Sequence, residues 1–120
     1  MRPHERLEVW ECAIDFVVRI YKTTKSFPRE EKFGLTSQIR RAAVSVPANI
    51  AEGAARQSVK EFSYFLSNAQ GSVSELATEI LIARRLGYVN EQTYRLDNDE
   101  LTSIGRMILG LARSVKRRGA

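Results

Sequence analysis

The sequence is poor in the residue types that build disulfides, metal centres and nucleophilic catalytic sites. Its 120 residues include one cysteine, Cys12, and one histidine, His4. A lone cysteine excludes an internal disulfide and is typical of proteins in a reducing cytoplasm. Di-iron sites in helical bundles need Glu-x-x-His pairs, and His4 lies outside every predicted helix. Cys12 has no histidine in its own segment to activate it. We therefore expect no metal, no cofactor and no enzymatic activity.

Long apolar runs and strand patterns are also missing. No apolar run approaches the ~18 residues that span a membrane, and no apolar signal-peptide core follows Met1. No stretch alternates polar and apolar residues, and Asn-Gly or Asp-Gly hairpin turns are absent. The 43% hydrophobic and 28% charged fractions are those of ordinary soluble globular proteins. We expect one all-α domain over residues 1–120, located in the cytoplasm.

Apolar residues recur at spacings of three and four in four segments. This spacing places them on one face of a helix, and it predicts helices at about 6–25, 34–57, 59–86 and 91–117. In the first segment the predicted buried stripe is Leu7, Trp10, Ile14, Val17 and Tyr21. In the second it is Leu35, Ile39, Ala42, Val46, Ile50 and Gly53.

Local signals mark the ends of the predicted helices. Ser58 and Glu61 have the spacing of a capping box at the start of the third helix. Gly87 suits the left-handed residue that follows a helix, and Asn90 is a good N-cap for the fourth. The polar residues 97–99 allow a break early in the fourth helix.

Pro47 lies inside the second predicted helix, where proline costs roughly 3 kcal/mol. The apolar periodicity continues in phase across it, so we favour one kinked helix. The alternative is a break at Val46, with Pro47 at the first position of a new helix. Short connections between four amphipathic helices favour an up-down-up-down antiparallel four-helix bundle. The second and third helices are rich in small residues, so we expect them to form the tightest pair.

Positive charge is concentrated at the end of the chain. The net charge is +5, and residues 101–120 hold five cations and no acid. The candidate nucleic-acid-binding residues are Arg40, Arg41, Arg84, Arg85, Arg113, Lys116, Arg117 and Arg118. In an up-down bundle the first four should be roughly level with one another and the last four at the opposite end. The alternative is a solvated surface with local ion pairs, such as Asp15 with Arg19 or Glu52 with Arg56.

Several motifs resemble those of a bacterial four-helix-bundle family, the 23S rRNA intervening-sequence proteins, also called S23. The resemblance rests on residues 38–43, 45–53, 62–69, 71–76 and 86–88, which include Asn-Ile-Ala-Glu-Gly and Gly-Ser-x-x-Glu-Leu. It implies a cytoplasmic bundle that assembles into a ring, most simply a homopentamer. It leaves the biochemical function open.

The candidate structural motif consists of Ser45, Pro47, Asn49, Glu52, Gly53, Gly71, Ser72 and Glu75. Its polar members Asn49, Glu52, Ser72 and Glu75 have two interpretations. They could form a ligand or partner site, or a hydrogen-bonded contact between the second and third helices, which we favour because buried polar groups must be paired. Our first functional hypothesis is a non-enzymatic ring that binds RNA or other nucleic acid through phosphate contacts. The second is a homo-oligomeric scaffold that docks a protein partner.

Overall fold

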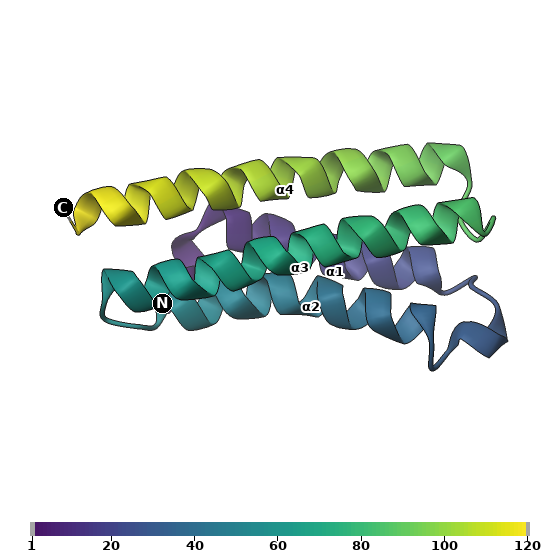
Figure 1. Cartoon of the computed structure of the whole chain (residues 1–120), viewed down its shortest axis with the longest axis horizontal. Coiled ribbons are helices and arrows are strands. Elements are labelled where there is room, and N and C mark those ends of the chain that lie inside the picture. The colour runs from purple at the N-terminus through teal and green to yellow at the C-terminus, as the bar shows by residue number, and fades with distance from the viewer. Residues whose placement is uncertain (1, 120) are drawn as a thin grey trace.

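Helices make up nearly the whole protein, and each predicted segment forms one. The computed structural model describes residues 2–119 (Figure 1). Its α-helices are α1 Glu8–Thr24, α2 Leu35–Ala54, α3 Val59–Arg85 and α4 Glu91–Arg118, and its short 3-10 helices are η1 Pro3–Arg6 and η2 Arg29–Glu31. No strand occurs between residues 2 and 119. The predicted all-α fold is confirmed.

Both ends of α3 and the start of α4 are set by residues that the sequence singled out. Ser58 Oγ accepts a hydrogen bond from the Glu61 N–H at 3.1 Å, and Asn90 Oδ1 accepts one from the Thr93 N–H at 2.8 Å. Gly87 has a φ of 82°. The next residue, Tyr88, donates its N–H to the carbonyl of Ala83 at 2.9 Å, which closes the last turn of α3 as a Schellman motif.

Two positions that could have interrupted helices do not do so. α2 runs through Pro47, which is buried within it, so the prediction of one continuous helix is confirmed. α4 likewise runs through residues 97–99. α2 nevertheless ends at Ala54, earlier than the predicted residue 57. The chain needs residues 55–57 to turn, because Ser58 must be extended, with φ −105° and ψ 146°, to cap α3.

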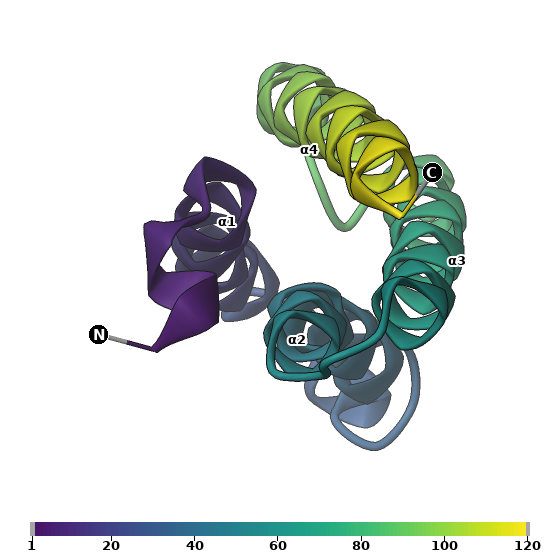
Figure 2. The same ribbon diagram turned by 90° about the vertical axis from the view of Figure 1, so that its left-hand side faces the viewer.

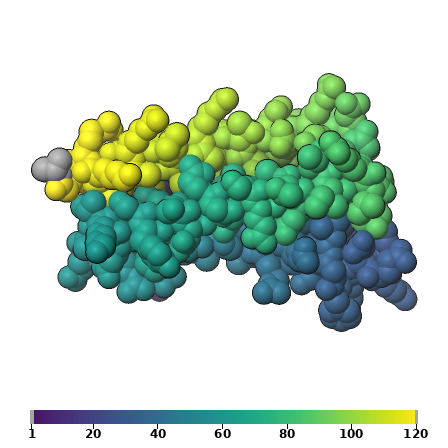
Figure 3. Space-filling view, in the orientation of Figure 1, coloured from purple at the N-terminus to yellow at the C-terminus, as the bar shows by residue number. Residues whose placement is uncertain are grey.

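Consecutive helices run antiparallel and form an elongated bundle of 48 × 23 × 22 Å. Figure 2 shows α1, α2, α3 and α4 following one another around the bundle axis. The α2–α3 interface is the most extensive, as predicted, and the α1–α4 interface is the smallest between neighbouring helices. In Figure 3, α3 and α4 form most of the visible face. Among the described residues, no helix is both long enough and apolar enough to cross a lipid bilayer.

Aliphatic side chains from all four helices fill the core. The largest fully buried ones are Ile20, Ile39, Ile50, Leu66, Leu76, Leu101, Ile104, Ile108 and Val115. Ile39 and Ile50 lie on the same buried side of α2, as the continuous helical period requires.

The stripe predicted for α1 is wrong. The residues of α1 that are buried lie one position away from it: Val9, Ala13, Phe16, Ile20 and Thr24. Of the predicted stripe, Tyr21 is 44% exposed and the other four are only partly buried. Both sets recur at spacings of three and four, so periodicity alone cannot choose between them. The packing of α1 against α2 and α4 decides which set enters the core.

Candidate nucleic-acid interface

A chain of hydrogen bonds crosses from α2 to α3 at the centre of the motif. Ser72 Oγ donates to the Asn68 carbonyl at 3.2 Å, and Asn49 Nδ2 lies 3.3 Å from Ser45 Oγ. The two serine hydroxyls are themselves hydrogen-bonded. Because the Ser72 proton is already used, Ser45 is the donor between them. Asn49, Ser45, Ser72 and Asn68 therefore form a one-directional chain, which supports the interpretation of these residues as an interhelical contact.

Gly53 allows α2 and α3 to approach each other closely. A Cβ atom at this position would lie 2.8 Å from Phe65 Cβ and 3.3 Å from the Phe62 carbonyl oxygen. Gly71 is different, because an added Cβ would meet no atom within 4 Å. Gly71 is exposed on the outer face of α3, so it takes no part in the close approach of these helices.

The two glutamates of the motif do not join the hydrogen-bond chain. Glu52 is exposed and pairs with Arg56 at 3.1 Å, as the local spacing predicted. Glu75 is also exposed, and with Gln38, Arg41 and Ser45 it lines an open groove of about 590 Å³ between α2 and α3.

Glu79 is a buried carboxyl group that the sequence analysis missed. Its side chain is only 7% exposed, and its Oε1 atom has no hydrogen-bond partner. Burial raises the pKa of Glu79 to about 7, and the neighbouring Glu75 carboxylate adds to the effect. Its position in the sequence could have indicated this burial, because Glu79 lies one helical turn after Glu75 and directly beside the core residue Ile80.

Asp97 is a second buried carboxyl group that the sequence analysis did not identify. It is 1% exposed. Its Oδ1 lies 2.9 Å from Arg19 Nε, and its Oδ2 accepts a hydrogen bond from Thr23 Oγ1 at 3.1 Å. Burial raises the pKa of Asp97, although Thr23 and Arg19 oppose this. The expected pair of Arg19 with Asp15 does not form, because Arg19 reaches across to α4.

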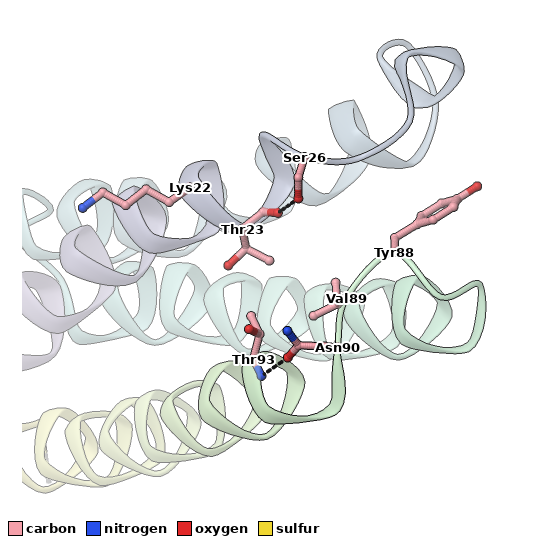
Figure 4. A pocket seen from close by; sticks show the side chains of 7 residues that line it. All are labelled: Lys22, Thr23, Ser26, Tyr88, Val89, Asn90 and Thr93. Atoms are coloured by element: carbon pink, nitrogen blue, oxygen red, sulfur yellow. Dashed lines mark hydrogen bonds between the residues drawn. The ribbon is translucent and has the colours of Figure 1, made fainter.

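A small polar hollow of about 350 Å³ lies beside this cluster, where α1 ends and α4 begins (Figure 4). Thr23 and Thr93 face each other across it, whereas Lys22 and Tyr88 extend away. Ser26 and Asn90 bond to nearby backbone atoms. These hydroxyl and amide groups lack the paired nucleophile and base that acyl transfer requires.

Cys12 and His4 are also unsuited to catalysis. Burial raises the pKa of the Cys12 thiol, and nearby carboxylates such as Glu100 raise it further, so its reactive thiolate is disfavoured at neutral pH. The His4 ring packs edge-on against Trp10, with centroids 4.8 Å apart. Across residues 2–119, no three His, Cys, Asp or Glu side chains are grouped closely enough to hold a metal ion.

The predicted basic residues near the start of α2 and the end of α3 are not one cluster. Arg41 borders the same groove as Glu75. Glu75 lies ten residues before Arg85, so the two are about 15 Å apart along α3. The expectation that these arginines are level with one another is therefore wrong. Arg40 donates to Thr24 Oγ1 at 2.8 Å and stacks on the Tyr21 ring. Arg84 donates to the Val89 carbonyl at 3.4 Å.

The four basic residues near the end of α4 are all exposed, and none forms an ion pair within the described chain: Arg113, Lys116, Arg117 and Arg118. The end of α4 packs beside the start of α3, because a Cβ on Gly119 would lie 3.0 Å from Val59 Cγ2. Lys60 and Arg56 are at this same end, bordering one groove. Positive charge therefore gathers at the end of the bundle where the described chain finishes.

Comparisons with known proteins support the family resemblance and the fold. The model of the family described as 23S rRNA-intervening sequence protein matches residues 5–110. Among solved structures, the chain is similar to a protein with unknown function from the S23 ribosomal protein family of Bacteroides thetaiotaomicron. The two are 26% identical, with a TM-score of 0.78, and the match covers 87% of this chain and 97% of that one. No curated relative matches significantly.

Proposed function

Because the chain belongs to the 23S rRNA-intervening sequence protein family, we propose that it is a non-enzymatic helical protein that binds RNA or other nucleic acid. The surface we assign to this role is the basic end of α4, formed by Arg113, Lys116, Arg117 and Arg118. One observation carries the proposal: residues 101–120 hold five cations and no acid, and these four side chains project into solvent without an ion-pair partner in the described chain.

Such a surface suits phosphate groups more than bases. Lysine and arginine side chains neutralise phosphates and release counterions, which gives affinity with little sequence preference. Single-stranded RNA readers add aromatic platforms on which bases stack. The nearest exposed ring at this end is Tyr64, which borders the groove with Arg56 and Lys60. We therefore assign the protein a preference for backbone geometry over sequence.

Assembly would strengthen these contacts. The family resemblance implies a ring, and we propose a homo-oligomer, most simply a pentamer, in the bacterial cytoplasm. A ring would present one copy of the basic end per subunit, so weak phosphate contacts would combine by multivalency. Sedimentation velocity of the purified protein, before and after nuclease treatment, would report both the subunit number and any nucleic acid that co-purifies.

The direct test is the salt dependence of binding to a fluorescein-labelled RNA hairpin, measured by anisotropy. We expect the triple variant Lys116→Gln, Arg117→Gln and Arg118→Gln to bind more weakly. The slope of log affinity against log salt should become shallower by roughly 2–3, because each lost phosphate contact removes about 0.7–0.9. The charge-preserving triple Lys116→Arg, Arg117→Lys and Arg118→Lys is the matched control and should bind like the wild type.

Two results would contradict the proposal. One is no detectable RNA binding by the wild type at low salt. The other is an unchanged salt slope in the glutamine triple, which would place any binding elsewhere. The competing hypothesis, a scaffold for a protein partner, predicts recovery of a specific protein by pull-down after nuclease treatment.

A further inference from the structure

α1 has two apolar stripes, and only one of them is fully buried in the core. Val9, Ala13, Phe16 and Ile20 are buried. Val18 and Tyr21 face outward on the adjoining side, at 51% and 44% exposed, and the neighbouring Val17 is half-buried against the core. Single exposed apolar residues are common and need no explanation. Here, however, the three lie within two turns of one helix, so they form a continuous surface that this chain leaves partly uncovered.

These three residues line a groove of about 570 Å³, which is completed by Lys22, Lys25 and Arg40. The floor is mostly apolar, and all three other lining residues are cationic. The position of the groove is well defined, because Arg40 bridges α2 to α1. Its guanidinium donates to Thr24 Oγ1 at 2.8 Å and lies 4.5 Å from the centre of the Tyr21 ring.

None of the cations that line the groove forms an ion pair within residues 2–119. Arg40 contacts only neutral groups, and neither Lys22 nor Lys25 takes part in an ion pair. A neighbouring hollow of about 370 Å³ shares Lys25 and Arg40 and adds Arg29 and Lys32 to its lining. The cationic border therefore continues beyond the end of α1 towards η2.

We propose that this groove on α1 docks an acidic amphipathic helix of a partner protein. Such a helix would place apolar side chains at i, i+3, i+4 and i+7 on Val17, Val18 and Tyr21. Its flanking carboxylates would meet Lys22, Lys25 and Arg40, which gives complementary charge at the rim.

Charge and chemistry argue against the other occupants. A nucleic-acid backbone could meet the cations but would leave the apolar floor facing polar sugars and phosphates. A second copy bound through the same groove in a two-fold arrangement would bring the two sets of cations together, and this is repulsive for a chain with net charge +5. A neighbour in the proposed ring would instead present a different surface to the groove, and the sedimentation measurement below identifies that occupant. The groove is also separate from the basic end of α4, so the inference does not depend on the proposed function.

The test uses the full chain and a fluorescein-labelled peptide of about 18 residues that carries leucines at i, i+3, i+4 and i+7 with flanking glutamates. A scrambled peptide of the same composition has the same charge but no apolar face. We expect the patterned peptide to bind at least about tenfold more tightly than the scrambled one. Val18→Asp should lower its affinity by at least about tenfold, because the new carboxylate meets the apolar side and repels the flanking acids.

Leu109→Asp is the matched control variant, since Leu109 is similarly exposed at 44% but lies on α4; it should bind the peptide like the wild type. Lys22→Gln with Lys25→Gln should weaken binding and reduce its salt dependence, whereas the glutamine triple at residues 116–118 should leave it unchanged.

The inference is overturned if the patterned peptide fails to bind at about 1 mM, a concentration that detects even a very weak complex. Equal affinity for both peptides would overturn it too, and so would a Val18→Asp variant that binds the patterned peptide as tightly as the wild type does. If Val18→Asp instead alters the oligomeric state measured by sedimentation, the occupant is a second copy and the proposal is wrong.

Discussion

Replacing Glu79 with glutamine should stabilise the protein above neutral pH and have little effect in acid. Glu79 is 7% exposed and lacks a partner for Oε1, and burial together with Glu75 raises its pKa from 4.5 to about 7. The folded state therefore holds a proton that the unfolded chain releases between these two values. By linkage, the wild type loses stability as the pH rises from about 4.5 to about 7. Glutamine keeps the shape of the side chain but carries no charge, so it avoids this loss.

The magnitude follows from the two pKa values of Glu79. The rise from 4.5 to about 7, at 1.36 kcal/mol per pKa unit, corresponds to at most about 3 kcal/mol. We expect Glu79→Gln to match the wild type near pH 4, and to exceed its free energy of unfolding by about 1–3 kcal/mol at pH 8. The lower end of this range allows for the surrounding structure to relax and partly solvate the charged Glu79 carboxylate.

Urea denaturation at several pH values, at one protein concentration, measures this difference directly. Urea is preferred to guanidinium because its neutrality leaves the electrostatic contribution unscreened. Glu52→Gln is the control, since Glu52 is exposed beside Arg56 and such pairs contribute only about 0–1 kcal/mol. A Glu79→Gln variant less stable than wild type at pH 8, or a difference that does not change with pH, would refute the reasoning.

Four further predictions concern the helix contacts and caps, each measured as the free energy of unfolding in urea. Gly53→Ala should destabilise the protein by about 1–3 kcal/mol, because its Cβ would overlap Phe65 in a packed interface. Gly71→Ala should instead stabilise it by up to about 1 kcal/mol, since the position is open and alanine favours helix; the reverse order would contradict the packing described for the two glycines. Ser45→Ala should destabilise by about 1–2 kcal/mol by interrupting the hydrogen-bond chain between α2 and α3, and an unchanged stability would show that this chain contributes nothing. Ser58→Ala should destabilise by about 1 kcal/mol through loss of the α3 cap, and no change would mean that the Glu61 N–H is satisfied equally well by water.

The start and end of α3 and the start of α4 could be predicted because their causes are local in the chain. Ser58 caps an N–H three residues away, Asn90 does the same, and Gly87 adopts a backbone conformation that other residues rarely accept. The continuity of α2 through Pro47 was equally readable, since its apolar spacing stays in phase on both sides. The cap and turn signals each span fewer than five residues, and the apolar spacing of α2 belongs to that one helix. None of these signals depends on how the other helices pack.

The burial of particular side chains depended on contacts between distant segments. Two stripes on α1 have the same spacing, and only packing against α2 and α4 decided that Phe16 enters the core and Tyr21 does not. Arg19 bonds to Asp97, a partner that no local rule could identify.

The sequence by itself determined four amphipathic helices, the caps of α3 and α4, and an excess of positive charge in residues 101–120. Tertiary structure alone decided which polar groups are buried, which of the predicted arginines are already used within the chain, and which apolar stripe remains exposed. The physical reason is that hydrogen bonding within a helix joins residues three or four apart. Burial and charge pairing are instead set by the surfaces that other helices bring near.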